Sequence, residues 1–250
     1  MTVAVSSIRG GVGKTTVTLA LADVLADSLR CGVVVVDADL EWGTAADSVP
    51  DYGRRRPTWI DLLGDVDQIR SPTDLAPYLL SLSHGVQLLP GPADPTQSEN
   101  LDTRELSGLL ELLGRFFPIV LLDLSPGSGL TGTLPEWAFS SADEIVAVST
   151  PTVGALRRAS RLLEHLDEAH PGVPVTLALN MVPKRPDATV TQVTELARDV
   201  HGQRRYAAIP QDDGLLRALN AGGLDVSELD QGTRVALKEM TVGLAQEWVR

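Results

Sequence analysis

The sequence predicts an α/β fold in which a mostly parallel β-sheet is covered by helices on both faces. Short apolar runs rich in β-branched residues alternate along the chain with longer segments whose apolar residues recur at helical spacing. This alternation is typical of parallel sheets, because each parallel crossover needs a connection as long as a helix. The expected strands are Val3–Ile8, Val33–Val36, Val86–Leu89, Ile119–Leu122, Ile145–Val148 and Val175–Leu179.

Helical spacing is clearest over Lys14–Leu29 and in the segment after Thr150. Residues Ala45–Pro77 contain several prolines and predict an irregular insertion with short helices. A final helix carries an apolar stripe, and the charges on its opposite face favour core packing over an amphipathic membrane anchor. The stripe consists of Leu237, Met240, Thr241, Leu244, Ala245 and Trp248. Without a repeat or a Gly/Ser linker, the sequence predicts one domain over residues 1–250.

Composition excludes several classes of protein. The single cysteine, Cys31, cannot form an internal disulfide or hold an iron–sulfur cluster, and we expect it to pack. The longest apolar runs end after four residues, which is too short for a transmembrane segment, and no signal peptide is visible. We therefore expect a cytoplasmic protein. A net charge of −12 disfavours nucleic-acid binding over the whole surface. The four histidines fall outside every motif and are expected to be surface or packing residues.

A glycine-rich segment follows the first expected strand and precedes the first expected helix. It consists of Gly10, Gly11, Val12, Gly13, Lys14, Thr15 and Thr16. Glycines allow successive backbone N–H groups to surround phosphate oxygens, and a helix N-terminus favours negative charge there. Lys14 supplies a cation for the β- and γ-phosphates, and the Thr15 hydroxyl suits Mg²⁺. The segment predicts a nucleotide-phosphate site, and a glycine turn with an incidental lysine is the weaker interpretation.

Carboxylates follow two of the expected strands. Asp37 and Asp39 come directly after Val33–Val36, and Asp123 comes directly after Ile119–Leu122. Ligands bind at the carboxyl ends of strands in open α/β sheets, so these acids are candidates for the same site as the glycine-rich segment. An apolar strand that ends in aspartate is the Walker B pattern, and in this pattern Asp123 would hold Mg²⁺ through water.

The glycine-rich segment departs from a standard P-loop, because Ile8 stands where the first glycine is expected. Residues 9–16, with the sequence RGGVGKTT, resemble the deviant Walker A motif KGGxGKTT of the ParA/MinD family of ATPases. The resemblance implies a P-loop NTPase fold, binding of ATP or ADP with Mg²⁺, and an ATP-dependent homodimer. In that family the first lysine reaches the partner's nucleotide, so Arg9 is expected to stabilise the partner's phosphates.

The resemblance also implies roles for the other motif residues. Asp39 would position or activate the attacking water and contact the metal, Asp37 would support the metal site, and Thr15 and Asp123 would be metal ligands. Asn180 follows a strand that in the family ends in a base-contacting asparagine. The segment 209–212, Ile-Pro-Gln-Asp, resembles an IPxD loop beside adenine, which makes Pro210 and Asp212 candidates. Ser125 replaces the first proline of the family's DxPPG sequence, a change expected to affect only the stiffness of that loop.

The spacing of residues 37–46 is closer to the CpaE/TadZ pilus-localisation group than to ParA partition proteins. It favours an ATPase that positions a pilus, secretion or division apparatus, with slow turnover until a protein partner stimulates it. The alternatives are a ParA-type partition ATPase that binds non-specific DNA and a weakly hydrolysing nucleotide-binding scaffold. The cations available for DNA are Arg54–Arg56, Arg157, Arg158, Arg161, Arg204 and Arg205. No MinD-like membrane-targeting tail is expected.

Overall fold

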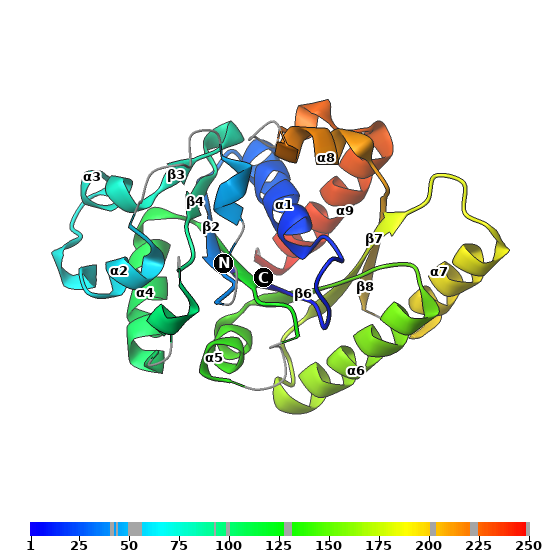
Figure 1. The fold of residues 1–250 in the computed structure, drawn as a ribbon, viewed down its shortest axis with the longest axis horizontal. Helices are drawn as coiled ribbons and strands as arrows, with labels where there is room; N and C mark the ends of the chain where they lie inside the picture. The colour runs from blue at the N-terminus through cyan, green and yellow to red at the C-terminus, as the bar shows by residue number, and fades with distance from the viewer. Residues whose placement is uncertain are drawn as a thin grey trace.

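We describe the fold from a computed structural model of the chain, which describes residues 1–40, 43, 45–49, 57–92, 94–98, 101–127, 132–200, 204–220 and 225–248. Over these residues eight strands form one sheet, in the order β3-β4-β2-β5-β1-β6-β7-β8 (Figure 1). The strands are β1 (Thr2–Ser6), β2 (Val33–Ala38), β3 (Leu80–Ser81), β4 (Gln87–Leu89), β5 (Ile119–Leu124), β6 (Glu144–Ser149), β7 (Val175–Val182) and β8 (Arg205–Pro210). Only β3 runs antiparallel to its neighbour, which confirms a mostly parallel sheet.

Helices cover both faces of this sheet, as the sequence predicts. The helices are α1 (Lys14–Leu29), α2 (Trp59–Leu63), α3 (Pro72–Leu75), α4 (Thr103–Phe116), α5 (Thr133–Ser141), α6 (Val153–Ala169), α7 (Ala188–Val200), α8 (Asp213–Asn220) and α9 (Gln231–Trp248). One hydrophobic core lies between the sheet and α1, α8 and α9. A second core lies on the opposite face, beneath α4, α5, α6 and α7 (Figure 1).

The final helix packs into the protein. Leu237, Met240 and Leu244 of α9 are at most 5% exposed and belong to the core that contains α1. Their burial confirms core packing of the apolar stripe. Across the described part of the chain, no helix combines the length and the apolar character needed to cross a membrane.

Two strands are absent from the sequence prediction. The strand β3 has only two residues, and β8 has the sequence RYAAIP, which lacks a β-branched run. β8 forms the edge of the sheet beyond β7, where a terminal proline is tolerated because no further strand needs its N–H. Ile209 and Pro210 therefore end a strand, and the expectation of a loop over 209–212 is wrong for these two residues.

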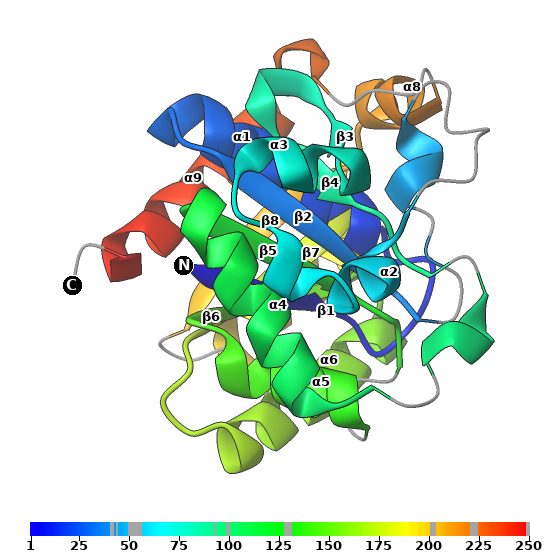
Figure 2. The same ribbon diagram turned by 90° about the vertical axis from the view of Figure 1, so that its left-hand side faces the viewer.

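The irregular segment after β2 contains short helices, as expected, and residues 50–56 lie outside the described part. Figure 2 shows α2 beside α4 and α3 near β3. The segment is anchored by Trp59, whose side chain is buried and whose indole N–H donates a 2.8 Å hydrogen bond to the carbonyl of Asp37. This contact ties the irregular segment to the end of β2.

A glycine next to the same carbonyl gives a stability prediction. A Cβ on Gly91 would lie 2.7 Å from the carbonyl oxygen of Asp37, so Gly91→Ala must displace backbone. We expect it to lower the free energy of unfolding by about 1–3 kcal/mol, measured by urea denaturation. The matched control is Gly108→Ala in α4, where no heavy atom lies within 4 Å of the new Cβ and a gain of about 0.5–1 kcal/mol is expected. Equal effects of the two substitutions would contradict this account.

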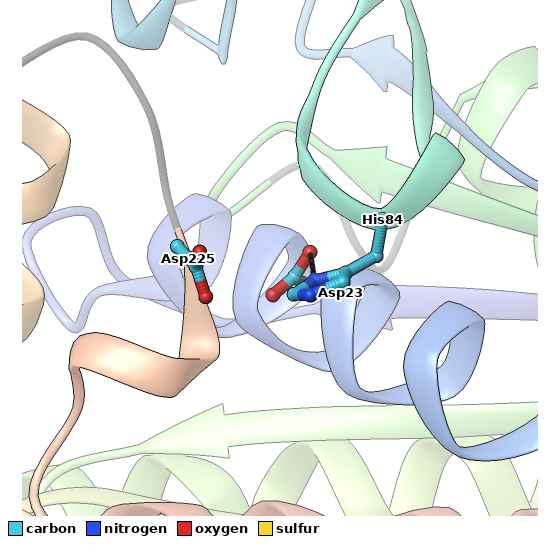
Figure 3. Close-up of side chains that lie close together, drawn as sticks. All are labelled: Asp23, His84 and Asp225. Carbon is cyan, nitrogen blue, oxygen red and sulfur yellow. Dashed lines mark hydrogen bonds and ion pairs between the residues drawn. The ribbon is translucent and has the colours of Figure 1, made fainter.

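A buried carboxylate in α1 joins three segments that are far apart in the sequence (Figure 3). Asp23 is 2% exposed, and one of its oxygens lies 2.8 Å from Nδ1 of His84, in the 3₁₀ turn Ser83–Gly85 between β3 and β4. Its other oxygen accepts a 2.8 Å hydrogen bond from the backbone N–H of Val226. Burial raises the pKa of Asp23 above its ordinary value, although the bonds from Val226 and His84 act to lower it.

The Asp23–His84 pair predicts a pH-dependent stability. The hydrogen bond to Asp23 raises the pKa of His84, and the nearby charges of Asp225 and Asp27 act in the same direction. The pair therefore stabilises the fold fully below the ordinary histidine pKa of about 6.5, and the contribution is lost as pH rises through the raised value. The raised pKa of Asp23 also favours the folded state at lower pH.

We expect the melting temperature of the wild-type protein to exceed that of His84→Asn by more at about pH 6 than at about pH 9. Asparagine is the test residue because it tolerates the positive φ of position 84. For Ser107→Ala in α4, which removes no titratable group, the difference from wild type should stay constant with pH. A constant difference for His84→Asn as well would contradict the prediction.

Candidate functional site

The glycine-rich loop lies between β1 and α1, at the centre of the sheet. Gly11 and Gly13 have φ values of 77° and 79°, a backbone region that favours glycine. A Cβ on Gly13 would also lie 2.4 Å from Nδ2 of Asn180, so both its conformation and its surroundings require glycine. The loop is held from outside by the N–H of Gly127, which donates to the carbonyl of Ser7 at 3.0 Å. The sequence therefore builds a curled loop directly before a helix N-terminus.

Asp123 at the end of β5 is the centre of a buried network beneath this loop. Its carboxylate accepts a 2.7 Å hydrogen bond from Nζ of Lys14 and a 2.6 Å bond from the Thr15 hydroxyl. Lys14 and Asp123 are 5% and 0% exposed, so each compensates the buried charge of the other. Thr18, one helical turn after Lys14, adds a third donor at 2.9 Å. Sequence reasoning missed Thr18, although its spacing from Lys14 places both on one helix face.

Asp37 lies within β2, paired in register with Asp123 of β5. It is 1% exposed, and its two carboxylate oxygens accept hydrogen bonds from the backbone N–H groups of Asp39 and Ala45 at 3.3 and 3.1 Å. Burial, followed by the charge of Asp123, raises the pKa of Asp37 to about 7. Its hydrogen bonds fix the start of the segment after β2 and thereby the position of Asp39.

Asp39 follows the end of β2 and is half-buried. One of its carboxylate oxygens accepts a 2.9 Å hydrogen bond from the hydroxyl of Ser125, which itself accepts a 2.9 Å bond from the N–H of Leu40. The expectation that a serine at position 125 affects only loop stiffness is therefore too narrow. A proline there could make neither bond, whereas Ser125 connects the segment after β5 to the segment after β2.

Arg9 stands at the exposed start of the glycine-rich loop. Within the described residues its guanidinium makes no hydrogen bond or ion pair. Beside it a cavity of about 260 Å³ lies between the loop, the end of β6 and the start of α6. The cavity is also lined by Arg158, whose buried Nε has no hydrogen-bond partner among the described residues.

The other arginines that the sequence offers for DNA binding differ in whether they form ion pairs. Arg204 and Arg205 form ion pairs with Asp167 and Glu144, so neither is an unpaired cation. Arg157 and Arg161 are exposed on α6, and Arg54–Arg56 lie outside the described residues.

Asn180, Pro210 and Asp212 lie at the ends of β7 and β8 or just after. Asn180 is 3% exposed and donates a 2.9 Å hydrogen bond to the carbonyl of Val12, which attaches β7 to the glycine-rich loop. Pro210 pairs with Val182. Asp212 accepts hydrogen bonds from the N–H groups of Gly214 and Asp230 at 2.7 and 2.9 Å. Burial acts to raise the pKa of Asp212, but its hydrogen bonds outweigh burial and hold the pKa below its ordinary value.

The donors at this site fit a nucleotide phosphate with Mg²⁺. The curled backbone and helix N-terminus favour an anion, and Lys14 offers a cation at the base of the loop. Thr15 and Asp123 bring a hydroxyl and a carboxylate within 2.6 Å of each other, and Mg²⁺ prefers such oxygen donors.

A curled glycine loop before a central helix, with lysine and aspartate meeting beneath it, defines a P-loop nucleotide-binding protein. The comparison with protein families agrees: the model of the CobQ/CobB/MinD/ParA nucleotide binding domain matches residues 3–225. The chain belongs to this family, which confirms the resemblance to ParA and MinD.

Individual relatives of this chain have sequence identities below 30%. The chain is 26% identical over 225 residues to the septum site-determining protein MinD of Synechocystis, covering 88% of this chain and 79% of that protein. It is 27% identical over 165 residues to the ESX-1 secretion-associated protein EspI of Mycobacterium tuberculosis H37Rv. That match covers 66% of this chain, which spans only 24% of EspI.

Solved structures share the fold. A ParA family ATPase from Chlorobium tepidum superposes with a TM-score of 0.80 at 20% identity, covering 96% of this chain and 98% of that chain. MinD from Pyrococcus horikoshii, complexed with Mg-ADP, superposes with a TM-score of 0.74 at 22% identity, covering 98% and 96%. These matches confirm the ParA/MinD-like P-loop fold. They do not address the CpaE/TadZ subgroup, which stays a prediction.

Proposed function

We propose that this chain is a Mg²⁺-dependent ATPase that alternates between an ATP-bound dimer and a monomer to position a cellular apparatus. The observation that carries the proposal is the convergence of Lys14, Thr15, Asp123 and Asp39 at the carboxyl ends of three neighbouring parallel strands. Each residue is of a type that phosphoryl transfer from ATP requires, and catalysis of this reaction depends mainly on positioning and charge.

In this proposal the glycine-rich backbone binds the phosphates of ATP, and Lys14 directs its charge to the β- and γ-phosphates. Thr15, Asp123 and Asp39 would hold Mg²⁺, which when bound neutralises charge on the phosphates. Asn180 orients the loop through Val12, and its family position beside the base, with Pro210 and Asp212, remains part of the proposal.

Asp39 orients the attacking water, and Ser125 positions Asp39 through its 2.9 Å hydrogen bond. Asp37 fixes the start of the same segment. Arg9 reaches from the exposed end of the loop to the phosphates of the partner's nucleotide, where a guanidinium can form two parallel hydrogen bonds. Loss of the γ-phosphate removes this contact, so hydrolysis returns the dimer to monomers.

We infer the kind of apparatus that is positioned from the names of the relatives and from the spacing of residues 37–46. The similar proteins are named for septum-site determination, secretion and the ParA family, and the spacing resembles the pilus-localisation group. We infer that a protein component of a division, secretion or pilus apparatus recruits the ATP-bound dimer and stimulates a slow intrinsic turnover. The scaffold alternative would keep the dimer and lose the turnover.

The test combines light scattering and DNA binding on the Asp39→Ala protein, which should hold ATP without hydrolysing it. We expect a dimer with ATP and a monomer with ADP, and we expect Arg9→Ala to remove the dimer while Arg161→Ala keeps it. A monomer under every condition would overturn the proposal.

The same ATP-loaded dimer is then titrated onto non-specific duplex DNA over a series of salt concentrations. We expect no binding at low salt, because Arg204 and Arg205 are paired and the chain has a net charge of −12. ATP-dependent binding that weakens as salt rises would instead support the DNA-partition alternative, with Arg157 and Arg161 as its first candidate contacts.

A further inference from the structure

Three side chains outside the nucleotide site converge on one point between α1, the turn before β4 and the segment before α9. Figure 3 shows the ring of His84 directed toward the carboxylate of Asp23, with Asp225 on a separate segment beside them. One potential ligand atom from each of Asp23, His84 and Asp225 lies within 4.8 Å of the other two. Among the described residues this is the one such group of three.

Negative charge at this point exceeds positive charge. A carboxylate oxygen of Asp225 lies within 4.8 Å of a carboxylate oxygen of Asp23 and of a ring nitrogen of His84. Arg30 pairs with Asp27 at 3.3 Å. This ion pair leaves the carboxylates of Asp23 and Asp225 facing the single imidazole of His84, and Asp23 is almost fully buried. A divalent cation would balance this charge.

The backbone also holds His84 in place. His84 has a φ of 51° and is followed by Gly85 at 81°, so the turn places a bulky residue in a left-handed conformation. The imidazole is 32% exposed, which leaves a solvent path to the ligand atoms.

We propose that Asp23, His84 and Asp225 bind a divalent transition-metal ion of the Zn²⁺ type. An imidazole nitrogen with two carboxylates suits Zn²⁺ and its neighbours, whereas Mg²⁺ and Ca²⁺ favour oxygen ligands alone. Ligand atoms about 2.1 Å from such an ion lie roughly 3.0–3.4 Å apart. The 2.8 Å separation of His84 and Asp23 is close to this value, and a modest movement of the half-buried Asp225 completes the set.

The ion would join α1, which begins at the nucleotide loop, to two segments that each hydrogen-bond to Asp23. Water would fill the remaining coordination positions on the exposed side of His84. This site is separate from the nucleotide site, so it binds metal without ATP and does not depend on the proposed ATPase activity.

Isothermal titration of Zn²⁺ into nucleotide-free protein, with Mg²⁺ present to occupy weaker carboxylate sites, tests the proposal. We expect one Zn²⁺ per chain, with His84→Asn and Asp225→Asn each weakening binding at least about tenfold, since even groups that only orient a ligand contribute 10–100-fold. The controls His165→Gln and Asp67→Asn should bind as wild type. Cys31→Ser should also bind as wild type, because Cys31 lines the same cavity as His84 but offers no ligand atom to the group of three.

The melting temperature gives a second readout that does not depend on the heat of binding. Zn²⁺ at 100 times its Kd should raise the melting temperature of wild type by about 5–10 °C and leave that of His84→Asn nearly unchanged. Each variant is first shown to melt cooperatively without metal, so a lost signal reports binding and not unfolding. Equal Zn²⁺ affinity in wild type and His84→Asn, or no Zn²⁺ binding to wild type, would overturn the proposal.

Discussion

Lys14→Ala is expected to lower the affinity for ATP by about 100-fold or more, equal to about 2.7 kcal/mol. The substitution removes the one buried cation beneath the glycine-rich loop among the described residues. It also removes the counter-charge of Asp123, which is 0% exposed and, among the described residues, keeps the hydroxyl donors of Thr15 and Thr18. An unpaired buried carboxylate repels phosphate and destabilises the fold, by about 3–5 kcal/mol for a broken buried pair.

The two effects can be separated with a double variant. Lys14→Ala with Asp123→Asn removes both charges, so stability in urea should return toward wild type while ATP binding stays lost. The matched control is Lys238→Ala, because Lys238 is exposed on α9 and far from the loop in sequence. Binding is measured with a fluorescent ATP analogue at a temperature where every variant is folded. Wild-type affinity in Lys14→Ala would refute the proposed phosphate contact.

The sequence predicts those parts of the site whose functional residues lie within one short segment of the chain. The loop over residues 9–16 and the aspartates after β2 and β5 follow from the rule that parallel strands present their carboxyl ends at one edge. The exact start of α1 at Lys14 follows from glycine and lysine at that point. No partner segment has to be known for these inferences.

The parts that sequence reasoning missed depend on which segments meet in space. In the sequence, Ser125 appears only as a replacement of a family proline. The pairing of β5 with β2 brings its hydroxyl to the carboxylate of Asp39, and this contact cannot be inferred from the sequence. His84 falls outside every motif, and its contact with Asp23 spans 61 residues. The sequence does not indicate β8, because one of its two buried residues, Ala207, has little strand propensity. Contact with β7 and α9 decides the structure of this segment.

Asp39→Ala is expected to lower the rate of ATP hydrolysis by about 100-fold or more while ATP binding is kept, because a group that orients the attacking water contributes about 100–10,000-fold. Lys14 and Thr15 are held by their own hydrogen bonds to Asp123, so the phosphate contacts should remain in this variant. Single-turnover measurements of phosphate release, made beside ATP-binding measurements, separate the two steps.

Ser125→Ala supplies the graded comparison. It leaves the Asp39 carboxylate in place and removes only the hydrogen bond that positions it, so we expect a smaller loss, about tenfold, with ATP affinity unchanged. Combined with Asp39→Ala, Ser125→Ala should add almost nothing, since a positioning residue acts through the group it positions.

Ser107→Ala, on the exposed face of α4, is the matched control and should hydrolyse ATP as wild type does. A full additional tenfold loss in the double variant would show that Ser125 acts independently of Asp39. Rapid hydrolysis by Asp39→Ala alone would assign the attacking water to another group.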